Sequence, residues 1–337
     1  MALVTVIIPM YNKGDLIARA IRSVRHQTFQ DFSVIVVDDG STDNGPSIVD
    51  NLDDDRIRLI RQPNAGPGAA RNTGIKAAQS EYLAFLDADD EWYPWFLENS
   101  IAAATKYNVS AVASMYYRVP DNIDITPLAA KNGIAPGRYE LDGTEQPVAA
   151  GALIAAFQPF NTVIKKQVVE KYGCFYDNNK CLYGEDQYLF IKIVANEPVA
   201  VITPPAARYH VESSQLGTVD VRRPLEPYLA DPEEILKGCP EQNKQLIAAV
   251  LELRAIRTAF HMLQTGRTKP AAELIKHFPN ANRHIKPYRK LMTAFAVGPA
   301  YHVHLNIKKS FARIRNALFP QPKNSIPQMP YENENEN

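Results

Sequence analysis

The sequence predicts an α/β protein whose mostly parallel sheet is flanked by helices and followed by a helical C-terminal extension. First, short apolar runs rich in β-branched residues alternate with segments of helical spacing over about the first 90 residues. Second, these runs stop at residues that end strands or open helices, such as Asp, Asn, Pro and Gly. Third, only helical periodicity is found after about residue 240. Strands that alternate with helices pair in parallel through right-handed crossovers.

Four strands are expected in the first part of the chain. Residues 3–8 and 32–37 are continuous apolar runs, which are typical of strands buried on both faces of a sheet. We expect Pro9 to end the first of them, and Asn12 or Asp15 to open the helix that follows. The remaining elements predicted here are strands 57–60 and 82–86, a helix over 46–52, and a second helix that the loop 64–74 opens and that runs to about Ala78.

The pattern becomes less regular after residue 90. A helix is predicted over 92–107 and a strand over 109–117, whereas 118–150 is rich in Pro, Gly and Asp and predicts a long loop or hairpin. Further strands are expected at 160–164, 199–202 and 207–210, with helices at 166–171 and 184–194.

Composition limits the class of protein. The chain has 337 residues, enough for one large domain or two, and 45% of them are hydrophobic. Its three cysteines lack metal-site spacing, which fits a reducing cytosol. The apolar first ten residues lack a charged leading region and include Pro9, so we interpret them as a strand and not as a signal peptide. No apolar run approaches the roughly 20 residues of a transmembrane helix.

Charge is balanced overall but not along the chain. Lysine plus arginine and aspartate plus glutamate each number 37, yet ten basic residues and three Glu fall in 274–337. Such asymmetry indicates a basic surface segment. The stripe of apolar residues in 306–318 leaves two interpretations: 283–318 lies on an anionic membrane surface, or it packs on the rest of the protein with its charges in solvent. No nucleic-acid-binding module is found, so no nucleic-acid partner is expected.

These patterns divide the chain into four parts. Residues 1–215 are expected to form the α/β domain, with halves of about 1–117 and 118–215, and residues 216–240 a polar linker. A helical, basic region is predicted over 241–319, and the Pro- and Asn-rich residues 320–337 are predicted to be disordered.

Two carboxylates mark the end of the fourth predicted strand. Asp87 and Asp89 follow the apolar run 82–86, and alternation along an extended chain points both to one side. Ligands bind at the carboxyl ends of strands in open α/β sheets. Two hard oxygen ligands there suit Mg²⁺ or Mn²⁺, with substrate phosphates completing the coordination shell. Taken alone, an Asp-x-Asp pair would also be found where acidic residues simply end a strand at the protein surface.

Three further stretches raise the significance of this pair. They are Val6-Ile-Ile-Pro-Met-Tyr-Asn12, Val36-Val-Asp-Asp-Gly-Ser-Thr-Asp43 and Gly68-Ala-Ala-Arg-Asn-Thr-Gly74, and they precede Phe85-Leu-Asp-Ala-Asp-Asp90 in the chain. Together with Gly184-Glu-Asp186, this order closely resembles the family 2 glycosyltransferases, which are inverting enzymes of the GT-A fold that use nucleotide sugars. The resemblance covers roughly residues 3–213 and leaves the helical extension unexplained.

The resemblance implies a nucleotide pocket in the N-terminal half. Pro9, Tyr11 and Asn12 would line the base and ribose, with Tyr11 offering a stacking face. Asp39 would accept a hydrogen bond from a base N–H, which favours uracil or thymine, and Asp38 could share that role. The alternative for the two acids is capping of the following helix.

The resemblance also implies the catalytic groups. Arg71 would contact the base or the diphosphate, Asp87 the ribose or a metal ion, and Asp89 the metal ion. Asp186 would be the general base for the acceptor hydroxyl, with Glu185 as the alternative. Acidic residues at a helix N-terminus also stabilise that helix, which is the non-catalytic explanation for Glu185 and Asp186.

Two weaker candidates complete the predicted site. His210 lies where the family often has a histidine that contacts the diphosphate or metal, although a structural histidine fits equally well. Trp92, Tyr93 and Trp95 could form a platform for the acceptor sugar, or they could belong to the core, which we favour for Trp95.

We therefore expect an inverting glycosyltransferase that moves a sugar from a UDP-sugar to a hydroxyl of a glycan or lipid-linked glycan with the help of Mn²⁺ or Mg²⁺. The family implies cytoplasmic or peripheral inner-membrane polysaccharide assembly for the cell envelope. A nucleotidyltransferase is the alternative enzyme, but the loop after the first strand is not glycine-rich. A scaffold that kept the fold is the non-enzymatic alternative. Gly66-Pro-Gly-Ala-Ala-Arg71 mimics a dinucleotide-binding motif, but Arg71 replaces its third glycine.

Overall fold

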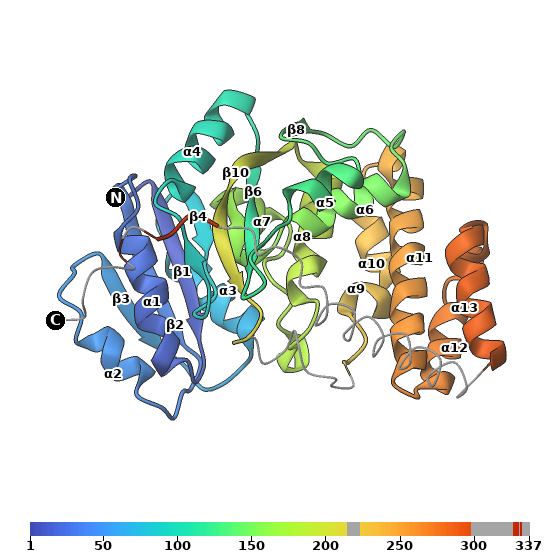
Figure 1. The fold of residues 1–337 in the computed structure, drawn as a ribbon, viewed down its shortest axis with the longest axis horizontal. Coiled ribbons are helices and arrows are strands. Elements are labelled where there is room, and N and C mark those ends of the chain that lie inside the picture. Colours follow the sequence, from blue (N-terminus) through green and yellow to red (C-terminus); the bar gives the residue numbers. More distant parts are fainter. Residues whose placement is uncertain (214–222, 298–325, 330, 332–337) are drawn as a thin grey trace, which may run out of the picture.

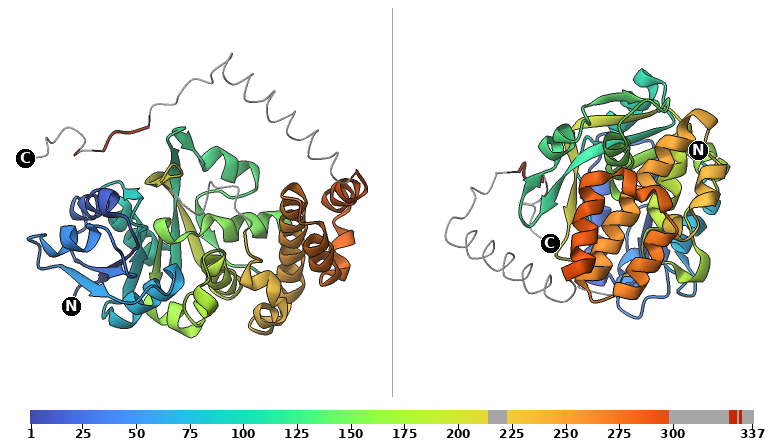
Figure 2. Two further views of the ribbon diagram at one scale, coloured as in Figure 1. Left: turned by 90° about the horizontal axis from the view of Figure 1, so that it is seen from below. Right: turned by 90° about the vertical axis from the view of Figure 1, so that its right-hand side faces the viewer.

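The computed structural model describes residues 1–213, 223–297, 326–329 and 331 (Figure 1). Its centre is one mixed sheet with the strand order β3-β2-β1-β4-β9-β6-β10-β5, in which β7 pairs with β6 and β8 with β10. Helices cover both faces of this sheet, and a group of helices formed by residues 227–297 packs at one end (Figures 1 and 2). The predicted α/β class with a helical extension is confirmed.

The first four strands form the parallel half of the sheet, as predicted. Side chains alternate between two cores: Ile7 and Phe85 point to one face, and Val6 and Ala84 point to the other. Both faces are covered by helices, which explains why the strand sequences are apolar throughout. The elements are β1 (Val4–Met10), α1 (Gly14–Arg25), β2 (Phe32–Asp38), α2 (Gly45–Asp50), β3 (Ile57–Arg61), α3 (Pro67–Ala77) and β4 (Tyr82–Phe85).

The second half of the sheet is mixed. β9 runs antiparallel to both of its neighbours, β4 and β6, whereas β6 and β10 are parallel. The two predicted strands 199–202 and 207–210 are one strand whose register shifts between Ile202 and Ala207. The elements are α4 (Phe96–Tyr107), β6 (Ala111–Val119), η1 (Pro159–Asn161), β9 (Thr162–Lys165), α7 (Lys166–Lys171), η2 (Asn178–Lys180), α8 (Glu185–Asn196) and β10 (Val199–His210).

Three local predictions were wrong. β1 continues through Pro9, because the parallel pairing with β2 extends to Met10. The helix expected over 92–107 begins only at Phe96, because Glu91–Trp92 forms strand β5 and pairs with β10. Residues 118–150 are not a bare loop. They contain β7 (Ile123–Asp124), α5 (Thr126–Lys131), β8 (Gly137–Tyr139) and the start of α6 (Pro147–Ala156).

The C-terminal helices extend the main core instead of forming a separate one. Leu246, Val250 and Leu251 of α11 are buried in the same apolar cluster as strand residues Ile7 and Phe85. The elements are α9 (Pro227–Ala230), α10 (Pro232–Lys237), α11 (Glu241–Gln264), α12 (Thr268–Lys276), η3 (Pro279–Arg283) and α13 (Ile285–Val297). Two of them, α9 and α10, lie within the stretch expected as a linker.

The basic segment 283–318 is described only as far as residue 297. There α13 packs Leu291 and Ala294 into the core and leaves Lys286, Arg289 and Lys290 in solvent. The predicted stripe over 306–318 lies outside the described residues, as does most of 320–337. Within the described part of the chain, no helix combines the length and hydropathy needed to cross a bilayer.

Candidate active site

A cleft of about 1440 Å³ opens where the carboxyl ends of β1, β2 and β4 meet the first turns of α3 and α8. This is where open α/β sheets hold their ligands. Of the predicted site residues, the cleft is lined by Pro9, Tyr11, Asp39, Arg71, Asp87, Asp89, Glu185 and Asp186. Asn12, Asp38 and His210 do not line it.

Asp39 holds the loop that forms one side of the cleft. It is buried, and its carboxylate accepts hydrogen bonds from Gln62 Nε2, the Ala65 N–H and the Gly66 N–H, each at 2.8 Å. Since each carboxylate oxygen can accept two hydrogen bonds, Oδ2 keeps capacity for a ligand donor. Asp38 instead accepts the Ser41 N–H at 2.9 Å, which caps its own turn.

Asn12 fixes the loop after β1. It adopts a left-handed conformation, with φ 51°, that asparagine tolerates better than most residues. Its N–H donates to Ser41 Oγ at 2.9 Å, and its Oδ1 accepts the Thr42 N–H at 2.8 Å. The neighbouring Tyr11 is 44% exposed and lies on the cleft. Asn12 thus acts on the pocket through Tyr11, whose ring can stack on a planar ligand.

Arg71 joins the two acidic groups of the cleft. It is buried on α3, and it donates from Nη2 to Asp87 Oδ1 at 2.7 Å and from Nη1 to Glu185 Oε1 at 2.9 Å. Its guanidinium also lies 5.2 Å from the ring centroid of Phe175. Burial disfavours the charge, but Asp87 and Glu185 outweigh it and raise the pKa of Arg71. The side chain is therefore a permanent cation at the centre of the cleft.

Asp89 has a partner that the sequence analysis did not identify. Lys13 Nζ donates to Asp89 Oδ2 at 2.8 Å and to the Ser213 carbonyl at 2.9 Å. Burial and the charge of Asp87 raise the pKa of Asp89, although Lys13 opposes this shift. Because β1 and β4 are neighbours in the sheet, a lysine three residues after β1 can reach the Asp-x-Asp segment. The sequence carried no signal for this pair, because the pairing of β1 with β4 is known only from the structure.

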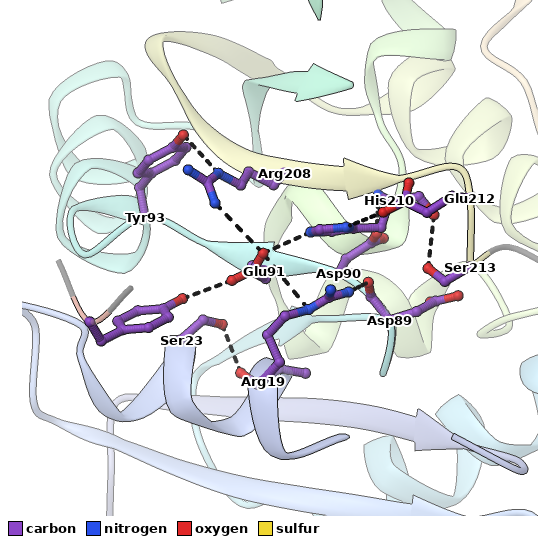
Figure 3. Close-up of polar contacts among 12 residues, drawn as sticks. Arg19, Ser23, Asp89, Asp90, Glu91, Tyr93, Arg208, His210, Glu212 and Ser213 are labelled. Atoms are coloured by element: carbon purple, nitrogen blue, oxygen red, sulfur yellow. Dashed lines mark hydrogen bonds and ion pairs between the residues drawn. The ribbon is translucent and has the colours of Figure 1, made fainter. Parts of the chain in front are cut away.

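Asp90 and Glu91 belong to a cluster of polar contacts beside Asp89 (Figure 3). Asp90 Oδ1 accepts the His210 N–H at 2.8 Å, and burial together with Asp89 and Asp87 raises the pKa of Asp90 well above its usual value. His210 contacts Glu91 Oε1 through Nε2 at 2.7 Å and Glu212 Oε1 through Nδ1 at 2.8 Å. Both ring nitrogens thus contact carboxylates. The structure does not place His210 beside Asp87, where it could serve as a further metal ligand.

The predicted aromatic platform lies in the core and not in the cleft. Trp92 and Tyr93 are fully buried, and Trp92 stacks on Phe96 at 4.1 Å between ring centroids. Tyr93 stacks on Trp95 and donates from its hydroxyl to the Pro327 carbonyl at 2.7 Å. Trp92, Tyr93 and Trp95 do not line the cleft, so the structure agrees with the core alternative, which was favoured for Trp95.

The C-terminal residues 326–329 and 331 pack against this aromatic cluster. Met329 and Tyr331 are buried with Tyr93, and Arg208 Nη2 donates to the Pro327 carbonyl at 2.7 Å. The Tyr331 hydroxyl donates to Glu91 Oε2 at 3.1 Å. We call these residues the C-terminal strap. The strap contacts Glu91, which follows Asp89 and Asp90 in the chain. The sequence analysis had assigned the residues of the strap to a disordered tail.

Glu185 and Asp186 occupy the first turn of α8. Gly184 immediately precedes the helix as its N-cap residue, with φ 82°, a conformation that favours glycine. Burial and the charge of Asp186 raise the pKa of Glu185 to about 7, against the effect of Arg71. Burial also raises the pKa of Asp186, and Arg71 again opposes the shift. A carboxylate whose pKa lies near neutrality is suited to proton transfer.

The residues around Asp89 provide a partial set of ligands for a divalent cation. Among the described residues, no cluster of three His, Cys, Asp or Glu forms a complete metal site. Asp87 and Asp89 nevertheless lie close enough for the charge of one to raise the pKa of the other. Sites of Mg²⁺ commonly use one or two carboxylates and take further oxygens from substrate phosphates and water. The donor set fits such a site, with Lys13 as a competing cation.

The fold is of the GT-A type, with the cleft at the strand ends. The model of "Glycosyl transferase family 2" matches residues 5–173, half of the chain, and the protein belongs to this family. Membership of this family favours the glycosyltransferase interpretation over the nucleotidyltransferase and scaffold alternatives. Staphylococcus aureus TarS, residues 1–349 in complex with UDP-GlcNAc, superposes with a TM-score of 0.62 at 19% identity and covers 88% of this chain and 92% of its own. This likeness concerns the fold.

Two relatives extend the comparison. The succinoglycan biosynthesis protein ExoW of Rhizobium meliloti is 44% identical over 117 residues, which are 32% of this chain and 36% of ExoW. The Escherichia coli protein named UDP-Glc:alpha-D-GlcNAc-diphosphoundecaprenol beta-1,3-glucosyltransferase WfgD is 28% identical over 219 residues, 64% of this chain and 80% of WfgD. The match to ExoW thus spans about a third of that relative's length.

Proposed function

We propose that the protein is an inverting, metal-assisted glycosyltransferase that moves a sugar from a UDP-sugar to a hydroxyl of a glycan or glycolipid. The observation that carries this proposal is the convergence of Arg71, Asp87, Asp89 and Asp186 on one cleft at the strand ends. The UDP-GlcNAc complex of TarS and the printed activity of WfgD support a nucleotide-sugar donor. As the family resemblance implies, we also place the reaction on the cytoplasmic side.

The nucleotide would lie over the ends of β1 and β2. Tyr11 would stack on the base, and Asp39 would accept a base N–H, which favours uracil over adenine. Arg71 and Lys13 would face the diphosphate. Asp89 and Asp87 would hold a divalent cation, which when bound would offset the charge on the departing nucleoside diphosphate.

Asp186 is the proposed general base. It takes the proton of the acceptor hydroxyl as the oxygen attacks the anomeric carbon opposite the leaving diphosphate, so the configuration inverts. Glu185 is held by Arg71 at 2.9 Å and is thereby less available for this role. The elevated pKa of Asp186 makes it a stronger base than an exposed aspartate. Inversion is testable by NMR of the anomeric configuration of the product.

The first experiment is a calorimetric titration with UDP, GDP and ADP, each with and without Mn²⁺. We expect Mn²⁺-dependent UDP binding that Asp89→Asn weakens and that Asp53→Asn, an exposed acid outside the cleft, leaves unchanged. Absence of nucleotide binding under every condition would refute the proposed donor site.

A further inference from the structure

The C-terminal strap contacts elements that are far apart in the sequence, namely α1, β5, the loop after β5 and β10. The ring of Tyr331 lies beside His26 of α1, with 4.8 Å between the ring centroids. Its hydroxyl donates to Glu91 Oε2 at 3.1 Å, across 240 positions of sequence. Tyr331 and Glu91 are both buried at this contact. The strap therefore covers an acidic side chain that belongs to the N-terminal part of the protein.

Glu91 carries a carboxylate that several cationic groups share (Figure 3). Its Oε1 contacts His210 Nε2 at 2.7 Å. The guanidinium groups of Arg19 and Arg208 lie 3.8 and 3.9 Å from the same oxygen. The Tyr331 hydroxyl adds a donor on the second oxygen, Oε2. Because each contact limits rotation of the carboxylate, the position of Glu91 depends in part on the strap.

Two partners of Glu91 also hold the Asp-x-Asp segment. Arg19 Nη2 donates to the backbone carbonyl of Asp89. The His210 N–H donates to Asp90 Oδ1 at 2.8 Å. Asp89 and Asp90 line the cleft, whereas Glu91 does not. A displacement of Glu91 would therefore reach the cleft through Arg19 and His210.

Exclusion of water gives the strap a second effect on these contacts. Arg19 Nε is buried and has no hydrogen-bond partner among the described residues, so the charge of Glu91 at 3.8 Å is what attracts it. Such an attraction is several times stronger where water is excluded than in bulk solvent. Met329 and Tyr331 exclude water on the side of Glu91 that faces the strap. Loss of the strap would therefore weaken the hold of Glu91 on Arg19.

We propose that Tyr331 is a positioning residue for the donor site, and that docking of the C-terminal strap raises the affinity for a divalent cation and for the nucleotide diphosphate bound with it. This proposal rests on the proposed transferase function. Tyr331 acts through Glu91, and Arg19 transmits the effect to the backbone of Asp89. A strap that only stabilised the fold would leave the metal-dependent part of UDP binding unchanged.

The test is a calorimetric titration of the full chain with UDP, with and without Mn²⁺, in wild type and Tyr331→Phe. This variant keeps the buried ring and removes only the hydroxyl that donates to Glu91. We expect the Mn²⁺-dependent affinity for UDP to fall about fivefold, as for the loss of one hydrogen bond. The affinity without Mn²⁺ should change by less than about twofold, because the strap acts on the proposed metal ligand.

Tyr172→Phe is the matched control. The Tyr172 hydroxyl also donates to a glutamate, Glu197 Oε1, at 2.7 Å, and neither residue lines the cleft. We expect this variant to bind UDP and Mn²⁺ as the wild type does. Urea unfolding of both variants compares their losses of stability, so that a difference in UDP affinity can be separated from a difference in stability.

A double-mutant cycle tests the route through Glu91. Glu91→Gln removes the charge that attracts Arg19, and we expect it to weaken Mn²⁺-dependent UDP binding at least as much as Tyr331→Phe does. In the Glu91→Gln background, Tyr331→Phe should have little further effect, since residues of one network are not additive. Additive losses would show that Tyr331 acts by another route and would overturn the proposal.

Amide hydrogen exchange locates the change in the structure. The Asp90 N–H donates to the Asp87 carbonyl at 3.0 Å. We expect amides of residues 88–92 to exchange about fivefold faster in Tyr331→Phe than in wild type, because the segment opens more often. Exchange in α7, next to Tyr172, should be the same in both proteins.

The outcomes separate this proposal from the proposed function. If wild type and Tyr331→Phe bind UDP and Mn²⁺ equally well, the positioning role is overturned and the donor site stands. An equal loss of affinity in Tyr172→Phe would also overturn it, because the effect would then be one of general stability. Failure of the wild type to bind UDP would contradict the proposed function itself. Exchange of residues 88–92 would then still decide whether the strap positions this segment.

Discussion

Arg71 Nη1 donates to Glu185 Oε1 at 2.9 Å across 114 positions of sequence, and this pair links the two halves of the catalytic cleft. Arg71 comes from α3 in the parallel half of the sheet, and Glu185 opens α8 in the mixed half. The same guanidinium also holds Asp87. A single buried cation thus sets the distance between the proposed metal-binding segment and the proposed base.

Replacement of Arg71 by methionine should damage both stability and activity. It leaves Glu185 buried without its cation, and such a change typically costs about 3–5 kcal/mol of unfolding free energy. We also expect kcat/KM to fall by at least about a hundredfold, since the positions of Asp87 and Glu185 are no longer fixed. Urea unfolding and initial rates measure the two effects. Arg56→Met, which breaks a surface pair with Asp54, is the control and should leave the rate unchanged.

The rate should increase with pH through neutrality. The raised pKa values of Glu185 and Asp186 belong to interacting acids, so they titrate together with apparent values for the pair. The base must be deprotonated, and we therefore expect kcat/KM to rise with pH over the interval in which this pair titrates, which includes the pKa of about 7 of Glu185. Glu185→Gln should move the midpoint to lower pH by removing a neighbouring charge. A profile that is flat over this interval would contradict the assignment.

The free energy of unfolding should decrease as pH rises, whereas the rate should increase. The pKa of Glu185 is about 7 in the folded protein and near 4.5 when unfolded, so the folded state binds more protons between these values. The contribution of Glu185 is therefore most favourable below about pH 4.5 and is lost as pH rises through 7, by at most about 3 kcal/mol. Urea unfolding of the wild type at several pH values should show this decline, and Glu185→Gln should show less of it.

Lys13 should compete with a divalent cation for Asp89. Its ammonium lies 2.8 Å from Asp89 Oδ2, where a metal ion would bind. We expect Lys13→Met to tighten Mn²⁺ binding to the nucleotide-free protein by about tenfold, which corresponds to the loss of one partly buried ion pair. Electron paramagnetic resonance of free Mn²⁺ measures this affinity. Asp89→Asn in the same background should abolish the gain, and unchanged affinity in Lys13→Met would show that the two cations use different sites.

The C-terminal strap should stabilise the segment behind Asp89. Tyr331→Ala removes a buried ring and the hydroxyl that donates to Glu91, so we expect a loss of about 2–4 kcal/mol in the unfolding free energy. Tyr331→Phe keeps the ring and should lose only about 1 kcal/mol. Urea unfolding distinguishes the two variants. Equal stability of wild type and Tyr331→Ala would mean that the strap is not docked in solution.

The sequence was sufficient for the elements that depend on local pattern. The four apolar runs around Ile7, Val36, Ile60 and Phe85 predicted the parallel half of the sheet, because strands buried on both faces need continuous apolar sequence. The order of the polar strand ends predicted where the cleft would form. Residues 118–150 were misjudged because their content of Pro, Gly and Asp suggested a loop or hairpin, whereas Pro147 occupies the first turn of helix α6.

Sequence alone determined the family, the strand ends and the acidic residues available for chemistry, since these follow from residue type and short-range spacing. Only the tertiary structure decided the partners: Lys13 beside Asp89, Arg71 between Asp87 and Glu185, and His210 enclosed by two glutamates. These contacts join residues that crossovers and antiparallel pairing bring together from distant positions. Their electrostatic effects depend on burial and on distances of a few ångströms, which spacing along the chain does not encode.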